Sequence, residues 1–405
     1  MKGAFIFILI CLASLQVSAQ IGHECSSRIF TDLVTPLKYP LEEHQVVTSD
    51  GYVLRVFRIQ AKNTQITSGK KVILLQHGNE SSSDDWVLND ESLSPAFFLA
   101  NQGYDVWMGN NRGNKYSLKN TKISRYSKSF WDFSFQEMGA RDMPATVAYI
   151  LKVTGQPNLV AVGHSQGSTQ WLAGLADPDS TQYLNSKVTK FIGLAPVVYA
   201  TQCYNKALKE FADNPLILDA CDVWGQWDMF PAACSIDSPE ALFMEYLCTI
   251  ANEMCKQFLA GGDLDPVYDN TKRLNIFLSH SPNGASVRVF QHFAQMFYQP
   301  KSDPQFMKFD FGRYENQKRY GQPTPPPYDF RNIKIPVAVF AGLQDTLADP
   351  GDSVILKNNL LKAGVTSSFY QYNQWGHMTY VWGLNPQGFF QDLLKEIQAV
   401  TGVVA

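Results

Sequence analysis

Ser165 is the residue of this chain whose neighbours best equip it to act as a nucleophile. An apolar run over 159–162 leads directly into Gly163-His164-Ser165-Gln166-Gly167, and a segment with helical character and small residues follows over 168–176. A strand, Gly-x-Ser-x-Gly and a helix in this order are typical of a strained turn that exposes a serine hydroxyl. The two glycines leave room for close backbone approach at such a turn. The pattern therefore predicts Ser165 as a catalytic nucleophile.

A serine hydroxyl is a poor nucleophile at neutral pH, so it needs an imidazole as base and a carboxylate to orient that imidazole. The chain has seven histidines, and His377 is the strongest candidate for the base. It follows an expected strand over 367–372, whereas the others lie in the N-terminal stretch, in an expected insertion or in other motifs. The alternative for His377 is a structural histidine with satisfied hydrogen bonds.

The acid is expected in the segment 343–352, which holds three carboxylates. Asp345 lies nearest the end of the preceding expected strand, and Asp349 and Asp352 are its rivals. Asp352 has the position of an N-cap for the helix that follows. Asp345 is therefore the predicted acid, in the chain order serine, acid, histidine.

The oxyanion that develops during acyl transfer needs two backbone N–H donors. The residue after the nucleophile, Gln166, supplies one, and an early junction of strand and loop supplies the other. The segment 74–78 ends an apolar strand at a His-Gly turn, so we expect the second donor at the amide of Leu75 or Gln76. His77 is expected to brace this turn rather than to take part in chemistry.

The elements that must position these residues form two blocks of alternating strands and helices. Strands are expected over 52–59, 72–76, 104–108, 159–162, 191–194, 335–341 and 367–372, and helices over 95–101, 142–153, 353–363 and 388–400. This alternation predicts an α/β fold with a mostly parallel central sheet flanked by helices. Between the two blocks, residues 200–311 are expected to form a helical insertion with helices over 240–249 and 286–298.

The predicted organisation is thus a core of residues 20–199 and 312–405, interrupted by the insertion over 200–311. Two sequential domains are the alternative, but the C-terminal block has too few elements to close its own core. Residues 1–19 have the layout of a secretory signal peptide, with Lys2, an apolar run over 4–15 and a small-residue cleavage site at Ala19. A membrane anchor is disfavoured because this run is shorter than the roughly 20 residues that span a bilayer. An extracellular or lysosomal protein of the secretory pathway is expected.

Composition limits the remaining function classes. The chain has 405 residues, 45% of them hydrophobic, and a formal charge of −3, so it can bury a large core and shows no basic excess. Neither a nucleic-acid partner nor electrostatic docking on anionic lipid is favoured. Short paired spacings of metal ligands and a glycine-rich dinucleotide loop are not evident, so no metal or cofactor is expected. The sequence does not indicate an oligomeric state.

Six cysteines remain after the expected cleavage: Cys25, Cys203, Cys221, Cys234, Cys248 and Cys255. In an oxidising compartment they predict up to three disulfides, with 15 possible connectivities, and buried thiols are the alternative. Asn79-Glu80-Ser81 is a possible glycosylation site at Asn79, although its position near the expected site makes modification doubtful.

Several long motifs, in order along nearly the whole mature chain, resemble the acid lipase family, the group of lysosomal acid lipase and gastric lipase within the α/β-hydrolases. They are Asp50–Leu54, Leu74–Gly78, Gly103–Asn114, Phe130–Met138, Asp142–Thr146, Gly163–Gly167, Leu278–Pro282, Leu347–Pro350 and Gly376–Gly383. The resemblance implies an α/β-hydrolase fold and a serine lipase or esterase. Such an enzyme would hydrolyse triacylglycerols, steryl esters or both through an acyl-enzyme, at a lipid–water interface.

Carried onto matching positions, the resemblance implies Ser165 as nucleophile, Asp345 as acid, His377 as base, and the amides of Leu75 and Gln166 as oxyanion donors. It also implies that residues 200–311 form a cap with a mobile lid over an apolar acyl pocket, and that Cys248 pairs with Cys255. A helical core without a pocket is the plainer interpretation of the apolar residues in this cap.

Two departures from the family and two other functions remain open. Asn79 and Glu80 follow the His-Gly turn where the family usually has apolar residues, and the additional cysteines indicate a differently cross-linked cap.

An acyltransferase would use the same three side chains but pass the acyl group to another alcohol. A non-catalytic lipid-binding member of the fold would require one of the three to be misplaced.

Overall fold

The computed structural model describes residues 28–205, individual positions between 209 and 229, and residues 265–403 except 266, 274, 275, 278 and 279. The predicted signal peptide lies outside the described residues. So do Cys25, Cys234, Cys248, Cys255 and the expected helix over 240–249.

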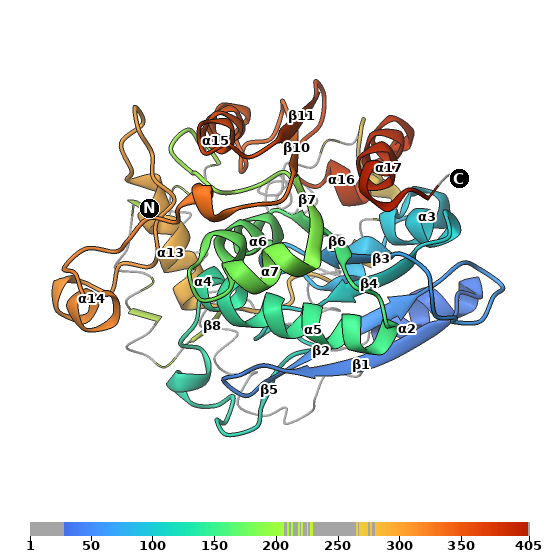
Figure 1. The fold of residues 1–405 in the computed structure, drawn as a ribbon, viewed down its shortest axis with the longest axis horizontal. Helices are drawn as coiled ribbons and strands as arrows, with labels where there is room; N and C mark the ends of the chain where they lie inside the picture. Colours follow the sequence, from blue (N-terminus) through green and yellow to red (C-terminus); the bar gives the residue numbers. More distant parts are fainter. Residues whose placement is uncertain are drawn as a thin grey trace, which may run out of the picture.

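A nine-stranded sheet forms the centre of the molecule (Figure 1). Its strand order is β1-β2-β4-β3-β6-β7-β10-β11, with β5 paired to β2. All pairings from β4 to β11 are parallel, and those of β1, β2 and β5 are antiparallel, which confirms the mostly parallel sheet. The strands are β1 (Leu41–Val47), β2 (Tyr52–Ile59), β3 (Val72–Gln76), β4 (Asp105–Gly109), β5 (Lys119–Asn120), β6 (Leu159–His164), β7 (Val188–Leu194), β10 (Val337–Gly342) and β11 (Ser367–Tyr372).

Helices cover both faces of this sheet. The α-helices are α2 (Arg28–Val34), α3 (Pro95–Asn101), α4 (Phe135–Glu137), α5 (Met143–Thr154), α6 (Gln166–Ala176), α7 (Thr181–Lys187), α13 (Val287–Phe297), α14 (Arg313–Tyr320), α15 (Pro350–Lys362), α16 (Thr379–Trp382) and α17 (Gln387–Thr401). Short 3₁₀ turns occupy Thr35–Leu37, Ser83–Trp86, Glu91–Leu93, Lys128–Phe130, Thr271–Arg273 and Phe330–Asn332, and a π-helical turn, η5, spans Met138–Asp142.

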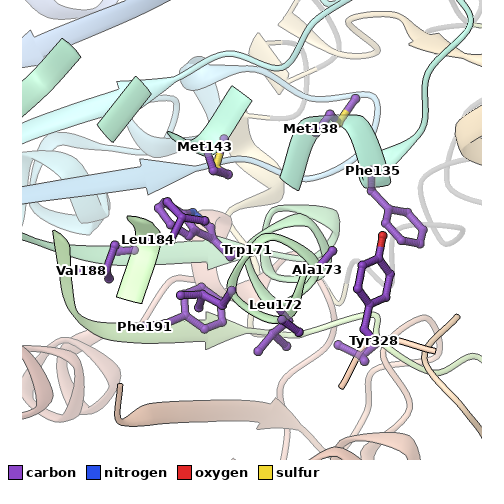
Figure 2. Packing of buried hydrophobic residues seen from close by; sticks show 14 of the residues in the cluster. Phe135, Met138, Met143, Trp171, Leu172, Ala173, Leu184, Val188, Phe191 and Tyr328 are labelled. Carbon is purple, nitrogen blue, oxygen red and sulfur yellow. The ribbon is translucent and has the colours of Figure 1, made fainter. Parts of the chain in front are cut away.

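The central strands are apolar on both sides because each face packs on its own core. Along β3, Val72 and Leu74 point into one hydrophobic cluster, and Ile73 and Leu75 point into the other. This division follows from the alternation of side chains along a strand. Figure 2 shows part of the first cluster, where Trp171 and other side chains of α5, α6, α7 and β7 gather. The second cluster includes residues of α3 and α17.

Most expected elements are present with boundaries that differ by a few residues at most, whereas elements such as β1, α7 and α14 were not expected. The start of α15 also differs from the expectation. This helix begins at Pro350, and the Asp349 side chain caps it by accepting a hydrogen bond of 2.7 Å from the Gly351 amide. Proline favours the first helical position because its φ is already helical and its missing N–H costs nothing there. The expectation that Asp352 is the N-cap is therefore wrong. Asp352 lies in the first turn and accepts from Thr201 Oγ1 at 2.7 Å and from the Gln202 amide at 3.0 Å.

Between β7 and β10, the described residues add no strand to the central sheet. Strand β8 (Asp228–Met229) instead pairs with β9 (Ala285–Ser286), and Ser286 caps α13. His292 of α13 stacks on Phe135 of α4 with ring centroids 3.9 Å apart, which attaches this region to the core. The boundaries of an insertion at 200 and 311 stay a prediction. Within the described residues, no helix combines the length and apolar character needed to cross a bilayer.

The contact between α6 and η5 gives a test of this packing. A Cβ on Gly174 would lie 2.9 Å from the carbonyl carbon of Gly139, so Gly174→Ala is expected to lower the free energy of unfolding by about 1–3 kcal/mol, as overpacking does. Urea unfolding measures the change. Gly388→Ala is the control because no atom lies within 4 Å of a Cβ there. Equal stability of the two variants would contradict the close approach of α6 to η5.

Candidate active site

Ser165 lies at the turn between β6 and α6 in a backbone conformation that residues other than glycine rarely adopt. Its φ is 55° and its ψ is −123°. The turn is held by close contacts at its two glycines: a Cβ on Gly163 would lie 2.6 Å from the carbonyl carbon of Gly167, and one on Gly167 would lie 2.7 Å from the His77 carbonyl oxygen. Such strain persists only where the surrounding packing enforces it.

The structure brings Ser165, His377 and Asp345 together in one hydrogen-bonded chain. His377 Nε2 lies 2.8 Å from Ser165 Oγ, and His377 Nδ1 lies 2.9 Å from Asp345 Oδ2. Asp345 follows β10 and His377 follows β11, which run parallel and adjacent. Both residues therefore come from the carboxyl edge of the sheet, where the turn after β6 also lies.

The Asp345 carboxylate is fully buried and oriented by the backbone. Its Oδ1 accepts hydrogen bonds from the amides of Leu347 at 2.9 Å and Ala348 at 2.7 Å, which leaves Oδ2 for His377. An imidazole that donates its Nδ1–H to a carboxylate has its Nε2 lone pair free. In this arrangement Nε2 accepts the proton of the Ser165 hydroxyl, so the three side chains can transfer that proton when the oxygen attacks an electrophile.

His164, the residue before the nucleophile, orients the segment that carries His377. Its Nε2 lies 2.9 Å from the His377 carbonyl oxygen, and the side chain is buried. Burial lowers the pKa of His164 to about 3, so the ring stays neutral and donates through Nε2. In the sequence, His164 stands out only as part of the Gly-x-Ser-x-Gly pattern. Its position next to the nucleophile was the one available signal.

Gly342, the last residue of β10, allows the same segment to approach the sheet. A Cβ at this position would lie 2.9 Å from the carbonyl carbon of Trp375, two residues before His377. A side chain there would push the His377 segment away from the strand ends. The position of the imidazole thus depends on contacts at both β6 and β10.

Of the two predicted oxyanion donors, only Gln166 is placed beside the nucleophile with a suitable amide. It is the first residue of α6, and the first N–H groups of a helix have no acceptor within the helix. Leu75 lies inside β3, fully buried, and pairs with Met108 of β4 and Val162 of β6. Its backbone is directed toward neighbouring strands, so the expectation of an oxyanion donor at Leu75 does not fit this geometry.

The turn after β3 lies next to Ser165 instead. A Cβ on Gly78 would lie 3.0 Å from Ser165 Cβ and 3.4 Å from Ser165 Oγ. The N–H of the next residue, Asn79, has no acceptor among the described residues. The strand ends at Gln76, and the chain reaches the nucleophile only two to three residues later. The apolar pattern of the sequence shows where the strand ends, but not how many residues later the chain reaches the nucleophile.

His77 braces this turn, as expected. Its Nδ1 lies 2.8 Å from the Gly78 carbonyl oxygen, and its Nε2 accepts a 3.0 Å hydrogen bond from the Asn111 amide. Burial lowers the pKa of His77 to about 4, so the ring is neutral with the proton on Nδ1. The histidine joins the loops after β3 and β4 without contacting the nucleophile through its ring nitrogens.

The predicted glycosylation site lies in the same turn. Asn79 is half-buried, its Oδ1 is buried with no hydrogen-bond partner in the described structure, and the Ser81 hydroxyl is bonded to Asp85. A glycan on Asn79 would have to emerge beside Ser165. Glycosylation stays a prediction, and this placement weighs against it.

Two cysteines fall within the described residues. Cys203 and Cys221 are buried, and the Cys203 Sγ donates to the Thr346 carbonyl oxygen at 3.2 Å, next to Asp345. The predicted pairing of Cys248 with Cys255 lies outside the described residues. In the part of the chain that the structure describes, no group of three His, Cys, Asp or Glu side chains is arranged to hold a metal ion.

Comparison with known proteins assigns the chain to a family. Residues 30–90 match a model described as a partial alpha/beta-hydrolase lipase region, and residues 71–233 match the alpha/beta hydrolase fold. Rat gastric triacylglycerol lipase is 36% identical over 387 residues, covering 92% of each chain. Mouse lipase member K is 35% identical, covering 91% of this chain and 90% of the relative. A putative lysosomal acid lipase/cholesteryl ester hydrolase of Crotalus adamanteus is 35% identical, covering 89% and 88%.

Solved structures agree on the fold. A putative lipase from Sulfolobus solfataricus superimposes with a TM-score of 0.53 at 14% identity, covering 89% of this chain and 99% of that one. DcsB, solved with its substrate analogue, gives a TM-score of 0.52 at 13% identity, with the same two coverages. At such identities these likenesses show the fold alone. The long sequence matches show more: this chain belongs to the acid lipase family, the group of gastric and lysosomal acid lipases within the α/β-hydrolases.

Proposed function

We propose that this protein is a serine lipase that hydrolyses carboxylic esters of lipids through an acyl-enzyme on Ser165. The observation that carries the proposal is the continuous hydrogen-bonded chain from the Ser165 hydroxyl through His377 to the buried Asp345 carboxylate. The names of the relatives add the substrate class, because they include gastric triacylglycerol lipase and a lysosomal acid lipase/cholesteryl ester hydrolase. Triacylglycerols are therefore the first substrates to test, and steryl esters the second.

In the acylation step, Ser165 Oγ attacks the ester carbonyl carbon while His377 Nε2 takes the hydroxyl proton. The imidazolium that forms is stabilised by Asp345, whose other oxygen is already held by two amides. The carbonyl oxygen becomes an oxyanion, and we assign its stabilisation to the amides of Gln166 and Asn79. Preorganised donors of this kind stabilise the transition state because they need no rearrangement when the charge develops.

Collapse of the tetrahedral intermediate breaks the bond to the leaving alcohol, which receives the proton from His377. Water then attacks the acyl-enzyme, gives its proton to His377 and releases the fatty acid. His377 finally returns the proton to Ser165 Oγ. Each proton that leaves an attacking oxygen is thus returned to a departing one, and the enzyme is regenerated unchanged.

The surroundings of this reaction are part of the same proposal. Residues 200–311 are proposed to form the cap over an acyl pocket, since the described part of this segment lies outside the central sheet. Action at a lipid–water interface and a location in the secretory pathway, extracellular or lysosomal, are proposed from the family. No observation favours acyl transfer to another alcohol, and comparing fatty acid release with transfer to added glycerol or sterol separates that alternative.

Removal of the Ser165 hydroxyl tests its role as nucleophile. Ser165→Ala is expected to abolish labelling by a fluorophosphonate probe and to lower kcat for an ester by at least about 10³-fold, because it removes the hydroxyl that lies 2.8 Å from His377 Nε2. Ser186→Ala is the matched control, since this residue lies on α7 away from the site. Labelling of a folded Ser165→Ala protein at the parent rate would contradict the assignment.

Two substitutions at Asn79 separate the effect of its backbone amide from that of its side chain. Asn79→Pro removes the N–H and is expected to lower kcat by about 10²–10³-fold with little change in KM, as loss of one oxyanion donor does. Asn79→Ala keeps the N–H and is expected to retain most of the parent kcat. Rates of a soluble short-chain ester measure both variants. Equal kcat values for the two would place the second donor elsewhere.

A substitution of His164 tests whether it is a positioning residue for His377. His164→Leu removes the hydrogen bond to the His377 carbonyl, so kcat is expected to fall by about tenfold while KM changes little. Because the pKa of His164 is lowered to about 3, its charge does not change between pH 5 and pH 8, and the variant should lose activity equally across this range. His44→Leu, on β1, is the control. A deficit confined to one end of that pH range would contradict the assigned role.

A further inference from the structure

A polar hollow of about 80 Å³ opens beside β2 and β5, apart from the three proposed catalytic side chains. Its walls include Gln45, Arg55, Lys115, Tyr116, Lys119 and Arg125. Four of these six side chains are cations, and none of the lining residues is acidic. We call this feature the cationic hollow. Its volume exceeds the roughly 10–15 Å³ that one water requires, so a small anionic group with a few waters can enter it.

Two of the four cations already have carboxylate partners. Arg55 forms an ion pair with Glu43 across the two neighbouring strands, and Lys115 Nζ lies 2.5 Å from the buried Asp84. Lys119 and Arg125 form no ion pair among the described residues, although the buried Asp228 interacts electrostatically with Arg125 at longer range. Arg125 donates to the Tyr126 hydroxyl at 2.9 Å and lies over that ring. The hollow therefore carries a local excess of positive charge, with four cations and no acidic residue in its walls.

The segment beside the hollow extends this charge onto the surface. Residues 116–127 contain no Asp or Glu and three cations, Lys119, Lys122 and Arg125. Lys119 and Lys122 are exposed, and Tyr126 is 68% exposed. Tyrosine is favoured at lipid–water boundaries because its ring is apolar and its hydroxyl is polar. An exposed tyrosine among lysines and arginines is suited to contact a lipid surface, which has anionic head groups outside and an apolar layer beneath them.

The hollow opens at the edge of the sheet that carries Ser165. Val56 of β2 pairs with Gly109, the last residue of β4, so Arg55 and the residues before it extend past the carboxyl edge of the parallel strands. Strand β5, which begins at Lys119, pairs with β2 in this extension. Figure 1 shows β5 at the border of the sheet beside β1 and β2.

Backbone hydrogen bonds connect the hollow to the turn beside the nucleophile. The Lys115 amide donates to the Asn283 carbonyl at 3.1 Å, and the Asn283 amide donates to the Glu80 carbonyl at 2.8 Å. Glu80 directly follows Asn79, to which we assigned an oxyanion donor. A surface bound at the hollow would therefore be held in a defined position relative to the proposed site.

We propose that the cationic hollow and the exposed segment 118–126 bind the anionic head groups of a lipid surface and turn the edge that carries Ser165 toward it. The head group is a phosphate or a carboxylate, since the planar fork of Arg125 and the ammonium of Lys119 suit either one. The net charge of −3 did not favour such docking. The local arrangement does, because Lys119, Lys122 and Arg125 lie close together in a segment without acidic residues.

This inference deepens the proposed function, and the two are tested separately. Adsorption is measured with the Ser165→Ala protein, which cannot turn over lipid, on vesicles of neutral phosphatidylcholine, on vesicles containing phosphatidylglycerol and on vesicles containing oleate. Stronger binding to either anionic vesicle is expected, with a preference that falls as salt is raised. Turnover of a soluble ester by the protein with Ser165 intact tests the chemistry alone.

The decisive variant combines Lys119→Gln with Arg125→Gln in the Ser165→Ala protein. Each lost cation is expected to weaken adsorption to anionic vesicles by about fivefold, so the pair weakens it by about 25-fold, while adsorption to neutral vesicles stays unchanged. The control, Lys152→Gln with Lys187→Gln, removes the same charge at the ends of α5 and α7, next to the starts of β6 and β7. It should retain nearly the parent preference.

Two results would overturn the proposal. The first is equal loss of adsorption in the two double variants, because net charge alone would then account for the preference. The second is calorimetric binding of inorganic phosphate that depends on Lys119 and Arg125 without any preference for anionic vesicles, because the hollow would then hold a soluble anion. In the background with Ser165 intact, the Lys119→Gln/Arg125→Gln protein should hydrolyse a soluble ester at the parent rate, which shows that it is folded.

Discussion

The left-handed backbone of Ser165 is the constraint on which the rest of the proposed site depends. A φ of 55° is unfavourable for serine. The serine backbone cannot relax to a more favourable conformation because Gly163, Gly167 and the carbonyl of His77 pack tightly around the turn. The same turn starts α6, so the first amide of that helix lies beside the hydroxyl. One strained residue thus places both a nucleophile and a donor at the carboxyl edge of the sheet.

The partners of Ser165 reach it because parallel strands end at a common edge. Asp345 and His377 follow two adjacent strands. The loops that carry them are held in place by tertiary contacts. His377 is oriented by Asp345 on one side, by the His164 hydrogen bond to its carbonyl on the other, and by the close approach at Gly342. Because His164 and Ser165 are consecutive, the nucleophile and the support of its base move together.

Much of the fold could be predicted from the pattern of residues. The strands Tyr52–Ile59, Val72–Gln76 and Ser367–Tyr372 and the helix Pro95–Asn101 have the expected boundaries, since their apolar periods end at glycine, proline or polar turns. The errors lie where one residue decides a local geometry. The N-cap of α15 is Asp349 rather than Asp352 because a proline starts the helix, and Leu75 lies within a strand whose turn reaches Ser165 only later.

Residue types and their order along the chain were enough to identify the class of chemistry, because the serine follows a strand and precedes a helix, and an acid and a histidine follow later strands in the order typical of α/β-hydrolases. They also identified the core, since the apolar period dictates which face of a strand or helix is buried. Packing in three dimensions was needed to show which amide lies near the hydroxyl and that His164 supports His377. It also brought cations as far apart in the chain as Arg55 and Arg125 to one edge. Each of these features depends on the distance between segments that are far apart in the chain. Tertiary contacts set such distances, and no local sequence pattern encodes them.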